Sequence, residues 1–549
     1  MEATLSETPY TAHVDTFARD NLPPARLQPE YIFERPELQF PARLNCATEL
    51  LDRWVRDGQG GRVCLRASAG SIWTYADLLA HANRIAHVLV NDMGLVPGNR
   101  VLLRAPNHPM MVACWFGVIK AGGIAVPTMP LLRAKELGQV IEKGEITHAL
   151  CDKALLAELA MAMEQCPTLR QVRCFRDDSP KGLEGSMQRH PVEFDNVDTA
   201  ADDTCILVFT SGTTGQPKGT LHFHRDVMAV CACWPPHVLK AAPDDVFIGS
   251  PPLAFTFGLG GLTLFPMSVG ASTVLIEKAG PRELLEAIPA YGATVLFTAP
   301  TAYRRMAEEA GARHLTAPLG GSLRKSVSAG EALPAATRAL WKHHTGLDMI
   351  EGIGSAEMLH IFISSDEPHA RPGATGTTVP GYRACIMDDD GHPVPPGTVG
   401  HLAIKGPTGC RYLADERQAT YVKDGWNYTG DAYLMDADGY FYFQSRTDDM
   451  IVSAGYNIGA LEVEEALMRH PAVAECAVIG EPDAERGQIV KAFVVPREGY
   501  TPSEALVREL QDFVKQAIAP YKYPRAIAFR QDMPRGVTDK LQRFKLREG

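Results

Sequence analysis

The 549-residue sequence predicts an α/β protein, in which a large N-terminal region of layered strands and helices precedes a small α+β C-terminal region. The alternation of two sequence patterns predicts this class. Apolar runs rich in β-branched residues, at 205–209, 246–248, 273–276 and 294–297, alternate with helical patterns such as 75–91. That alternation is typical of buried, largely parallel strands covered by helices.

Two changes of texture divide the rest of the chain. From about 375 to 446, short strands surround turn signals such as Asp390-Gly391, which predicts a β-rich subdomain. After Arg446 the pattern becomes α+β and ends in a basic tail. The elements expected there are helices at 462–469 and 503–519 and strands at 474–479 and 491–495. We therefore expect a large domain of residues 1–446 and a small domain of residues 447–549.

Charge and hydropathy exclude several classes of partner. With 54 Lys+Arg against 65 Asp+Glu, the net charge of −11 gives no overall basic field for nucleic acid or an anionic membrane. The most apolar stretch, 110–132, contains Lys120 and two prolines, which favours buried strand and turn over a membrane helix. Residues 1–20 lack the apolar core of a secretory signal. We expect a cytoplasmic protein that binds neither nucleic acid nor membrane.

The twelve cysteines are scattered, and the one close pair lacks the spacing of a redox or zinc site. Buried free thiols are therefore expected. His222 and His224 lack neighbours of ligand type at metal-binding spacing, which predicts packing or surface roles for both.

A glycine- and hydroxyl-rich segment directly follows the strand at 205–209. Its sequence is Thr210-Ser-Gly-Thr-Thr-Gly-Gln-Pro-Lys-Gly219. The glycines let the backbone approach an oxyanion, the hydroxyl and N–H groups donate hydrogen bonds, and Lys218 adds positive charge. The segment predicts a phosphate-holding loop, and its spacing differs from that of a Walker A loop.

This loop resembles the signature loop of the acyl-adenylate-forming superfamily, which contains acyl- and aryl-CoA ligases, peptide-synthetase adenylation domains and luciferases. Other segments resemble that family's motifs in the family's order. They are 328–334 for the adenine pocket, 352–357 for the Mg²⁺-holding glutamate, 424–431 for the ribose-binding aspartate, 445–451 for the hinge and 534–543 for the catalytic lysine.

The resemblance implies a role for each matching residue. The implied catalytic residues are Lys540, Glu357 and Lys218, and Glu357 is also the metal ligand. The implied ATP and AMP contacts are Thr210, Ser211, Gly212, Thr213, Thr214, Gly330, Glu331, Ala332, Gly352, Ile353, Gly354, Ser355, Ala356, Asp431, Phe443 and Arg446. The implied hinge is Asp448, and the implied thioester-step loop contains Gly455 and Tyr456. A carboxylate that attacks the α-phosphate of ATP approaches a polyanion, so the site must supply cations and directed donors.

Three positions depart from the family pattern. Ala356 stands where most relatives carry Thr, so one hydroxyl donor near the phosphate is missing. Ile353 takes the place of an adenine-stacking Tyr, so the contact there is aliphatic. Asp539 replaces the Gly before Lys540, which restrains that loop or partly screens the lysine.

The acid-binding pocket implied by the resemblance is apolar and aromatic. Its expected residues are Ala254, Phe255, Thr256, Phe257, Gly258, His360 and Ile361. Amino-acid-activating relatives need a carboxylate for the substrate ammonium, and Thr256 stands in that place, which disfavours an α-amino acid. An uncharged aniline nitrogen needs only a hydrogen-bond partner, such as His360 or Thr256; the alternative for His360 is a satisfied core histidine.

These segments look most like benzoate-type CoA ligases, and residues 11–19 look like the 2-aminobenzoate branch. We therefore expect an enzyme that activates an aromatic acid, 2-aminobenzoate first and benzoate second, as the aryl-AMP and transfers it to coenzyme A. ATP, Mg²⁺ and CoA are the implied cofactors and co-substrates. The expected state is a monomer or homodimer, with a downstream acyltransferase or carrier protein as a further partner.

Three other functions remain open at this point. An aryl acid adenylating enzyme would load a carrier protein in place of CoA. An ATPase or kinase would cleave ATP at the γ-phosphate and release ADP. A non-catalytic regulator would bind nucleotide or aryl acid without turnover.

Overall fold

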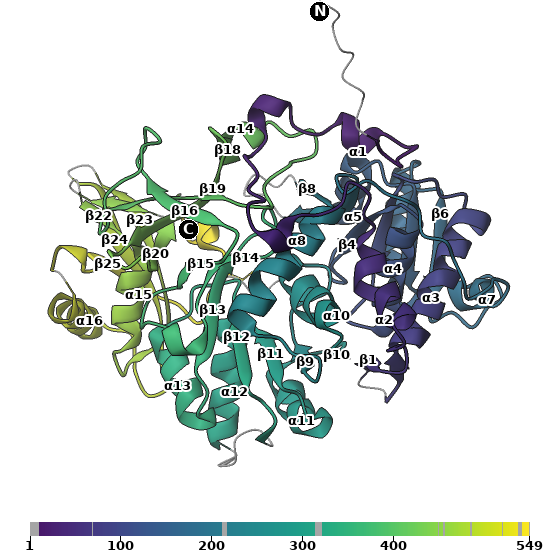
Figure 1. Cartoon of the computed structure of the whole chain (residues 1–549). Helices are drawn as coiled ribbons and strands as arrows, with labels where there is room; N and C mark the ends of the chain where they lie inside the picture. The colour runs from purple at the N-terminus through teal and green to yellow at the C-terminus, as the bar shows by residue number, and fades with distance from the viewer. Residues whose placement is uncertain are drawn as a thin grey trace, which may run out of the picture.

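The structure is a computed structural model of the whole chain. It describes residues 10–67, 70–210, 217–312, 321–447, 450–453, 456–483, 486–518, 520–535 and 541–547. Four sheets run through these residues, and helices cover the two larger ones (Figure 1). The α/β class expected from the sequence is confirmed.

The first sheet has six strands in the order β6-β5-β3-β4-β7-β8. Its strands are β3 (Arg100–Arg104), β4 (Ile124–Thr128), β5 (His148–Asp152), β6 (Gln171–Phe175), β7 (Thr204–Thr210) and β8 (Lys218–Phe223). All neighbouring pairs are parallel except β7 and β8, which form an antiparallel hairpin. The predicted phosphate loop connects these two strands in the sequence.

The second sheet has nine strands in the order β15-β14-β13-β12-β11-β9-β10-β1-β2. Its strands are β1 (Val63–Ala67), β2 (Ile72–Thr74), β9 (Val246–Gly249), β10 (Ser272–Leu275), β11 (Val295–Thr298), β12 (Lys325–Ser328), β13 (Met349–Gly354), β14 (Ile361–Ser364) and β15 (Thr377–Thr378). The central run from β1 to β13 is parallel, and antiparallel strands close both edges. Parallel neighbours end at the same edge of a sheet, so the loops after β9, β12 and β13 meet there.

Helices fill the space between and around these two sheets. The longer ones are α3 (Tyr75–His87), α4 (Pro109–Lys120), α5 (Ala134–Lys143), α6 (Leu156–Gln165), α8 (His224–Trp234), α11 (Pro281–Tyr291), α12 (Pro300–Ala312) and α13 (Ala335–Thr345). The short ones are α1 (Phe17–Asp20), α2 (Arg53–Arg56), α7 (Leu183–Met187), α9 (Thr256–Leu259), α10 (Phe265–Val269) and α14 (Gln418–Tyr421).

The helix α4 explains why the most apolar stretch of the sequence is not a membrane segment. Every residue of α4 is buried, and its side chains join one core cluster with residues of both large sheets. No helix among the described residues is both long and apolar enough to cross a bilayer.

A third, antiparallel sheet lies between the large sheets and the C-terminal part. Its strands are β16 (Arg383–Met387), β17 (Val399–Lys405), β18 (Val422–Lys423), β19 (Trp426–Met435) and β20 (Phe441–Arg446). They pair in the order β16-β17-β19-β18, and β20 also pairs with β19. The cross-strand register places Asp431 directly opposite Arg446.

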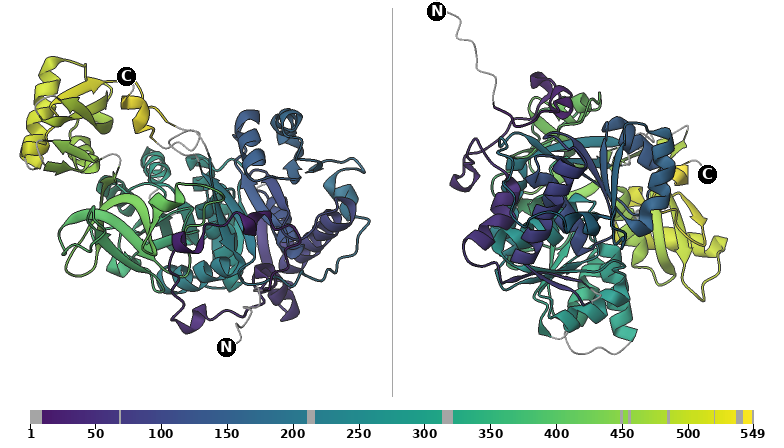
Figure 2. Two further views of the ribbon diagram at one scale, coloured as in Figure 1. Left: turned by 90° about the horizontal axis from the view of Figure 1, so that it is seen from above. Right: turned by 90° about the vertical axis from the view of Figure 1, so that its right-hand side faces the viewer.

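The C-terminal part has its own sheet and its own cores, which contain only residues beyond 450. Its elements are β21 (Ile451–Ser453), β22 (Tyr456–Ile458), α15 (Ala460–Met468), β23 (Val473–Asp483), β24 (Gly487–Pro496), α16 (Glu504–Ala517), β25 (Ala526–Phe529) and α17 (Arg543–Arg547). Figure 2 shows this yellow-green part at one end of the molecule. The proposed boundary residue Asp448 lies outside the described residues.

A buried ion pair gives a stability test. Lys120 is fully buried, and its Nζ donates to Asp52 Oδ1 at 2.5 Å, while Asp52 is partly exposed and also accepts from Asn196. Burial lowers the pKa of Lys120, and Asp52 opposes that effect. The effects of removing the two partners should therefore differ. Removal of Asp52 leaves the buried Lys120 ammonium without a counter-charge or water, whereas removal of Lys120 leaves a carboxylate that water can reach.

We predict that Asp52→Ala lowers the free energy of unfolding by about 3 kcal/mol or more, because a buried ammonium loses its partner. Lys120→Met should cost no more than about 1 kcal/mol, because an apolar side chain of similar length refills the site. Urea unfolding followed by circular dichroism measures both. A larger loss for Lys120→Met than for Asp52→Ala would contradict this assignment.

Candidate active site

The predicted phosphate loop connects the paired ends of a hairpin. Thr210 ends β7, Lys218 begins β8, and the two residues are directly opposite in the register. Ser211, Gly212, Thr213 and Thr214 lie outside the described residues. Strand pairing thus fixes the backbone of Lys218 where β8 begins.

Glu357 follows β13 as a buried carboxylate, with 9% of its surface exposed. Its Oε1 accepts a hydrogen bond from the Tyr412 hydroxyl at 2.5 Å. The Lys218 Nζ donates to the same hydroxyl at 3.5 Å. One tyrosine hydroxyl therefore links the base of the phosphate loop to the predicted metal ligand.

Asp431 and Arg446 form an ion pair across β19 and β20, with Arg446 Nη1 2.9 Å from Asp431 Oδ1. Burial raises the pKa of Asp431; Arg446 and Thr429 oppose this effect, and the negative charge of Glu357 adds to it. Asp431 and Glu357 therefore lie close enough to act on each other electrostatically.

Tyr421 lies between these groups and Ser355. Its hydroxyl is 3.3 Å from the Ser355 Oγ, and its ring packs edge-on against Tyr412. Burial raises the pKa of Tyr421, and the charges of Glu357 and Asp431 raise it further. Side chains from β8, the loop after β13 and β19 thus share one neighbourhood, as the sequence motifs predict.

The remaining predicted nucleotide contacts lie nearby on the same framework. Gly330, Glu331 and Ala332 follow β12, whose parallel neighbour β13 contains Gly352, Ile353 and Gly354. A Cβ at Gly354 would come within 2.6 Å of the His360 carbonyl oxygen, so only glycine fits there. Phe443 lies on β20, where its ring contacts Tyr433.

The aromatic part of the predicted acid pocket surrounds His360. The imidazole centroid is 4.4 Å from the Phe265 ring centroid, edge to face, and lies farther from Phe257 and Trp234, at 6.0 and 5.8 Å. The Phe297 and Phe257 ring centroids are 5.5 Å apart. Ala254, Phe255, Thr256 and Gly258 belong to the segment after β9, and Ile361 begins β14.

His360 is a buried imidazole without a conventional partner. It is 3% exposed, and neither ring nitrogen makes a hydrogen bond of ordinary geometry to a described residue. Burial lowers its pKa to about 3, although the nearby backbone of Phe257 favours the protonated form. The side chain is therefore neutral at physiological pH, with a donor and an acceptor available inside an apolar cluster.

Sequence reasoning missed several members of this aromatic cluster. Trp234, Phe265 and Phe297 come from α8, α10 and β11, so no single motif contains them. The one sequence feature that could have indicated these neighbours is the Gly260-Gly261 pair, because both glycines lie against rings of the cluster. A Cβ at Gly260 would lie 2.6 Å from the His360 Nε2, and one at Gly261 would lie 2.4 Å from the Phe297 ring.

Several predicted residues stay untested by the geometry. Lys540, Asp539, Asp448 and Gly455 lie outside the described residues. Tyr456 begins β22, and only its backbone is described. The thioester-step loop and the catalytic lysine therefore remain predictions.

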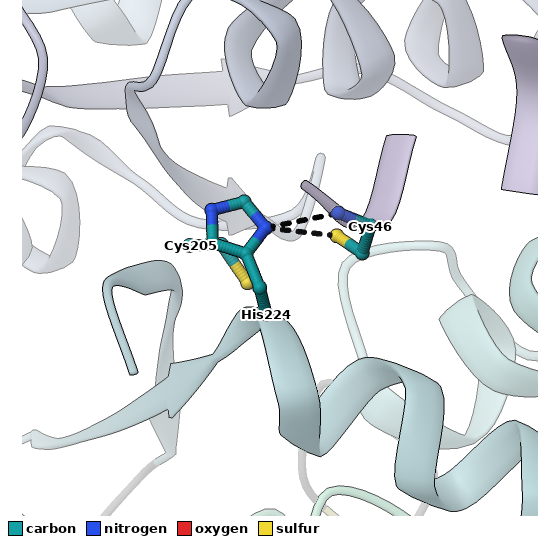
Figure 3. A group of neighbouring side chains, drawn as sticks. All are labelled: Cys46, Cys205 and His224. Atoms are coloured by element: carbon teal, nitrogen blue, oxygen red, sulfur yellow. Dashed lines mark hydrogen bonds between the residues drawn. The ribbon is translucent and has the colours of Figure 1, made fainter. Parts of the chain in front are cut away.

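A cluster that the sequence did not predict lies in the core. Cys46, Cys205 and His224 each present a ligand-type atom, all within 4.8 Å of one another (Figure 3). The His224 Nδ1 is 3.3 Å from the Cys46 Sγ and accepts the Cys46 backbone N–H at 3.2 Å. That nitrogen already accepts a hydrogen bond, and a structural zinc site takes four ligands where this cluster offers three. We therefore interpret the three side chains as part of the packed core and not as a metal site.

The family models match in two segments. Residues 51–412 match the AMP-binding enzyme family, and residues 462–540 match the AMP-binding enzyme C-terminal domain. The chain belongs to the AMP-binding enzyme family. The acyl-adenylate-forming resemblance of the sequence motifs is therefore confirmed, and the enzyme is an AMP-forming acid–CoA ligase.

Similar proteins cover nearly the whole chain. The benzoate–CoA ligase of Thauera aromatica is 34% identical over 518 residues, which span 93% of this chain and 97% of that protein. The structure of the anthranilate CoA ligase AuaEII in complex with anthranoyl-AMP superimposes with a TM-score of 0.86 at 33% identity, covering 94% and 98% of the two chains. A benzoate CoA ligase from Burkholderia xenovorans LB400 gives a TM-score of 0.82 at 31% identity, covering 92% and 100%.

The neutral state of His360 predicts a pH dependence of stability. Its folded pKa of about 3 lies below the ordinary histidine value of 6.5, so the unfolded chain binds one more proton between these values. Stability should therefore fall as pH drops below 6.5. Relative to His360→Gln, the parent should lose up to about 1.4 kcal/mol more per pH unit.

Urea unfolding at pH 6.5, 5.5 and 5.0 measures this difference. The exposed His343→Gln variant serves as the control and should follow the parent. Parallel pH profiles for the parent and His360→Gln would show that His360 is not held neutral by burial.

Proposed function

We propose that this enzyme is an aryl-CoA ligase. Its preferred acid is 2-aminobenzoate, and benzoate is the alternative acid. The acid carboxylate attacks the α-phosphorus of ATP, the bond to the β-phosphate oxygen breaks, and pyrophosphate leaves. The CoA thiol then attacks the carbonyl carbon of the aryl-AMP and releases AMP. The observation that carries this proposal is the buried, neutral His360 inside an aromatic cluster.

The aromatic cluster suits a planar ring. Phe257, Phe265, Phe297 and Trp234 contribute apolar faces and edges around His360, and aromatic groups pack well in such arrangements. Thr256, where an amino-acid-activating relative carries a carboxylate, offers no counter-charge for an ammonium group. The cluster therefore favours an aromatic acid whose ring carries no charged substituent over an α-amino acid.

The unpaired nitrogens of His360 favour an ortho substituent with hydrogen-bonding capacity. Leaving a buried donor or acceptor without a partner costs free energy, and a substrate group that pairs with it recovers that cost. The amino group of 2-aminobenzoate is uncharged near neutral pH and can donate to, or accept from, a neutral imidazole. Benzoate fills the same apolar space without that hydrogen bond.

The nucleotide side of the proposal uses Lys218, Glu357, Asp431 and Arg446. Lys218 holds phosphate oxygens, and Asp431 accepts from the ribose hydroxyls, with Arg446 beside it. A single buried carboxylate fits Mg²⁺, which commonly takes one or two protein carboxylates and substrate phosphates. Bound there, Mg²⁺ would neutralise phosphate charge during attack. No hydrogen bond to the Glu357 Oε2 occurs among the described residues, which leaves that oxygen for the cation.

We further propose that residues 447–549 act as a lid on the domain of residues 1–446 and turn about Asp448 between the two steps. Lys540 serves adenylation, and the loop with Gly455 and Tyr456 serves thioester formation. CoA is the proposed acceptor because the similar proteins named above are CoA ligases. Loading of a carrier protein is the alternative acceptor reaction.

A panel of acids in ATP–pyrophosphate exchange tests this function. We expect exchange that depends on the acid, strongest with 2-aminobenzoate, then benzoate, and negligible with an aliphatic acid such as hexanoate. Release of AMP upon addition of CoA should follow the same order. Exchange strongest with hexanoate, or release of ADP, would contradict the proposal.

A matched variant tests the role of His360. His360→Phe should lower kcat/KM for 2-aminobenzoate by roughly tenfold more than for benzoate, because one buried hydrogen bond to the substrate is lost. His343→Gln controls for loss of an exposed histidine. An equal effect on both acids would leave the aromatic class intact and refute the amino-group assignment.

A further inference from the structure

A segment that no predicted motif contains runs along the exit of the phosphate loop. Residues 410–418, which precede and enter α14, pair with β8: the Leu221 N–H donates to the Arg411 carbonyl, and the Leu413 N–H donates to the Gly219 carbonyl. Tyr412 forms the bridge to Thr220. Because β8 begins at Lys218, this 410–418 segment fixes Tyr412 beside Lys218.

Two ion pairs anchor the 410–418 segment. Arg411 is fully buried and its Nη1 is 2.6 Å from Asp226 Oδ2 on α8. Asp415 pairs with Lys143 on α5 at 2.6 Å. Each anchor connects the segment to a different helix of the framework, so Tyr412 lies on backbone that is held from both sides.

The backbone of Tyr412 is also fixed directly. Its N–H donates to the Gln418 Oε1 at 2.9 Å, and the Gln418 amide donates in turn to the Leu27 and Cys410 carbonyls. The side chain is 1% exposed. A rigid backbone and full burial leave the hydroxyl little freedom to move away from its partners.

The hydroxyl lies between opposite charges. It donates to Glu357 Oε1 at 2.5 Å and accepts from Lys218 Nζ at 3.5 Å. Without this hydroxyl, the ammonium and the carboxylate would be free to form a direct ion pair. Such a pair would neutralise the cation intended for phosphate and the carboxylate intended for metal.

A second contact fixes the Glu357 loop from the same strand. The His222 Nε2 is 2.8 Å from the Ala356 carbonyl oxygen, to which it donates, and the His222 Nδ1 is 3.7 Å from Asp226 Oδ2. The His222 Nδ1 makes no hydrogen bond to a described residue, so the Nε2 contact alone fixes this backbone. The backbone before Glu357 and the hydroxyl in front of it are thus held from β8 and from the segment paired with it.

We propose that Tyr412 is a positioning residue for the nucleotide site. Its hydroxyl keeps Lys218 and Glu357 apart, holds Glu357 Oε1, and leaves the second carboxylate oxygen for the divalent cation of the ATP complex. That the ligand is an ATP–cation complex rests on the proposed function. The hydrogen bonds of Tyr412 are independent of it.

The test compares Tyr412→Phe with the parent in Mn²⁺ binding in the presence of ATP and absence of any acid, read by electron paramagnetic resonance. We expect roughly tenfold weaker Mn²⁺ binding, because without the hydroxyl the Lys218 ammonium can pair with Glu357 and compete with the cation for that carboxylate. The KM for ATP should rise, and adenylation, which uses the divalent cation, should fall more than thioester formation from supplied aryl-AMP and CoA. Tyr75→Phe is the matched control, since it removes another buried hydroxyl, bonded to the Ala271 carbonyl at 2.8 Å.

A double-mutant cycle with Lys218→Met isolates the spacing role. If the hydroxyl acts by keeping Lys218 from Glu357, Tyr412→Phe should weaken Mn²⁺ binding less than about threefold once Lys218 is absent. Equal losses in both backgrounds would overturn the spacing role, and parental Mn²⁺ affinity in Tyr412→Phe would overturn the proposal. Thermal midpoints compared with Tyr75→Phe separate either result from misfolding.

The two proposals fail in different ways. A parent that binds Mn²⁺ with ATP but shows no acid-dependent pyrophosphate exchange refutes the proposed function and leaves the Tyr412 comparison valid. A parent that exchanges normally, together with unchanged Mn²⁺ affinity in Tyr412→Phe, refutes the positioning role alone.

Discussion

Bringing a carboxylate to a triphosphate is the physical constraint on which this architecture depends, since both reactants are anions. The protein must hold cations and hydrogen-bond donors in place before the reactants meet. It does so at one edge of the nine-stranded sheet, where the parallel strands β9, β12 and β13 end, and beside the β7–β8 hairpin. Lys218 and Glu357 reach this region from separate sheets, and β19 adds Asp431.

Buried acids in such a place are costly, and the contacts around them explain how the fold keeps them. Asp431 has Arg446 opposite it on the neighbouring strand, so sheet register alone sets their separation. Glu357 has no arginine or lysine in direct contact among the described residues; a tyrosine hydroxyl donates to it instead. A neutral donor stabilises the carboxylate without neutralising it, which keeps its charge available to a ligand.

Much of this arrangement could be predicted from sequence because it depends on local patterns. The strand before Thr210 and the glycines after it predict a phosphate loop, and the order of later motifs predicts the family. The aromatic cluster could be predicted only in part. Phe257 and His360 lie in motif-like segments, whereas Trp234 and Phe297 reach the cluster through helix packing and strand order.

Tyr412 shows the same limit more sharply. Its own surroundings in the sequence suggest a turn residue, and its importance arises from pairing with β8, nearly two hundred positions away. The Cys46, Cys205 and His224 cluster likewise exists only after folding, since its members are far apart in the chain. Long-range pairing of this kind leaves no periodicity or spacing for a single sequence to reveal.

The most direct measurement of the central claim follows the oxygen of the acid. When 2-aminobenzoate labelled with ¹⁸O in its carboxylate is turned over with ATP and CoA, the account predicts one labelled oxygen in the phosphate of AMP, because the carboxyl oxygen becomes the bridge to the α-phosphorus. Label in inorganic phosphate or pyrophosphate, with none in AMP, would contradict the account.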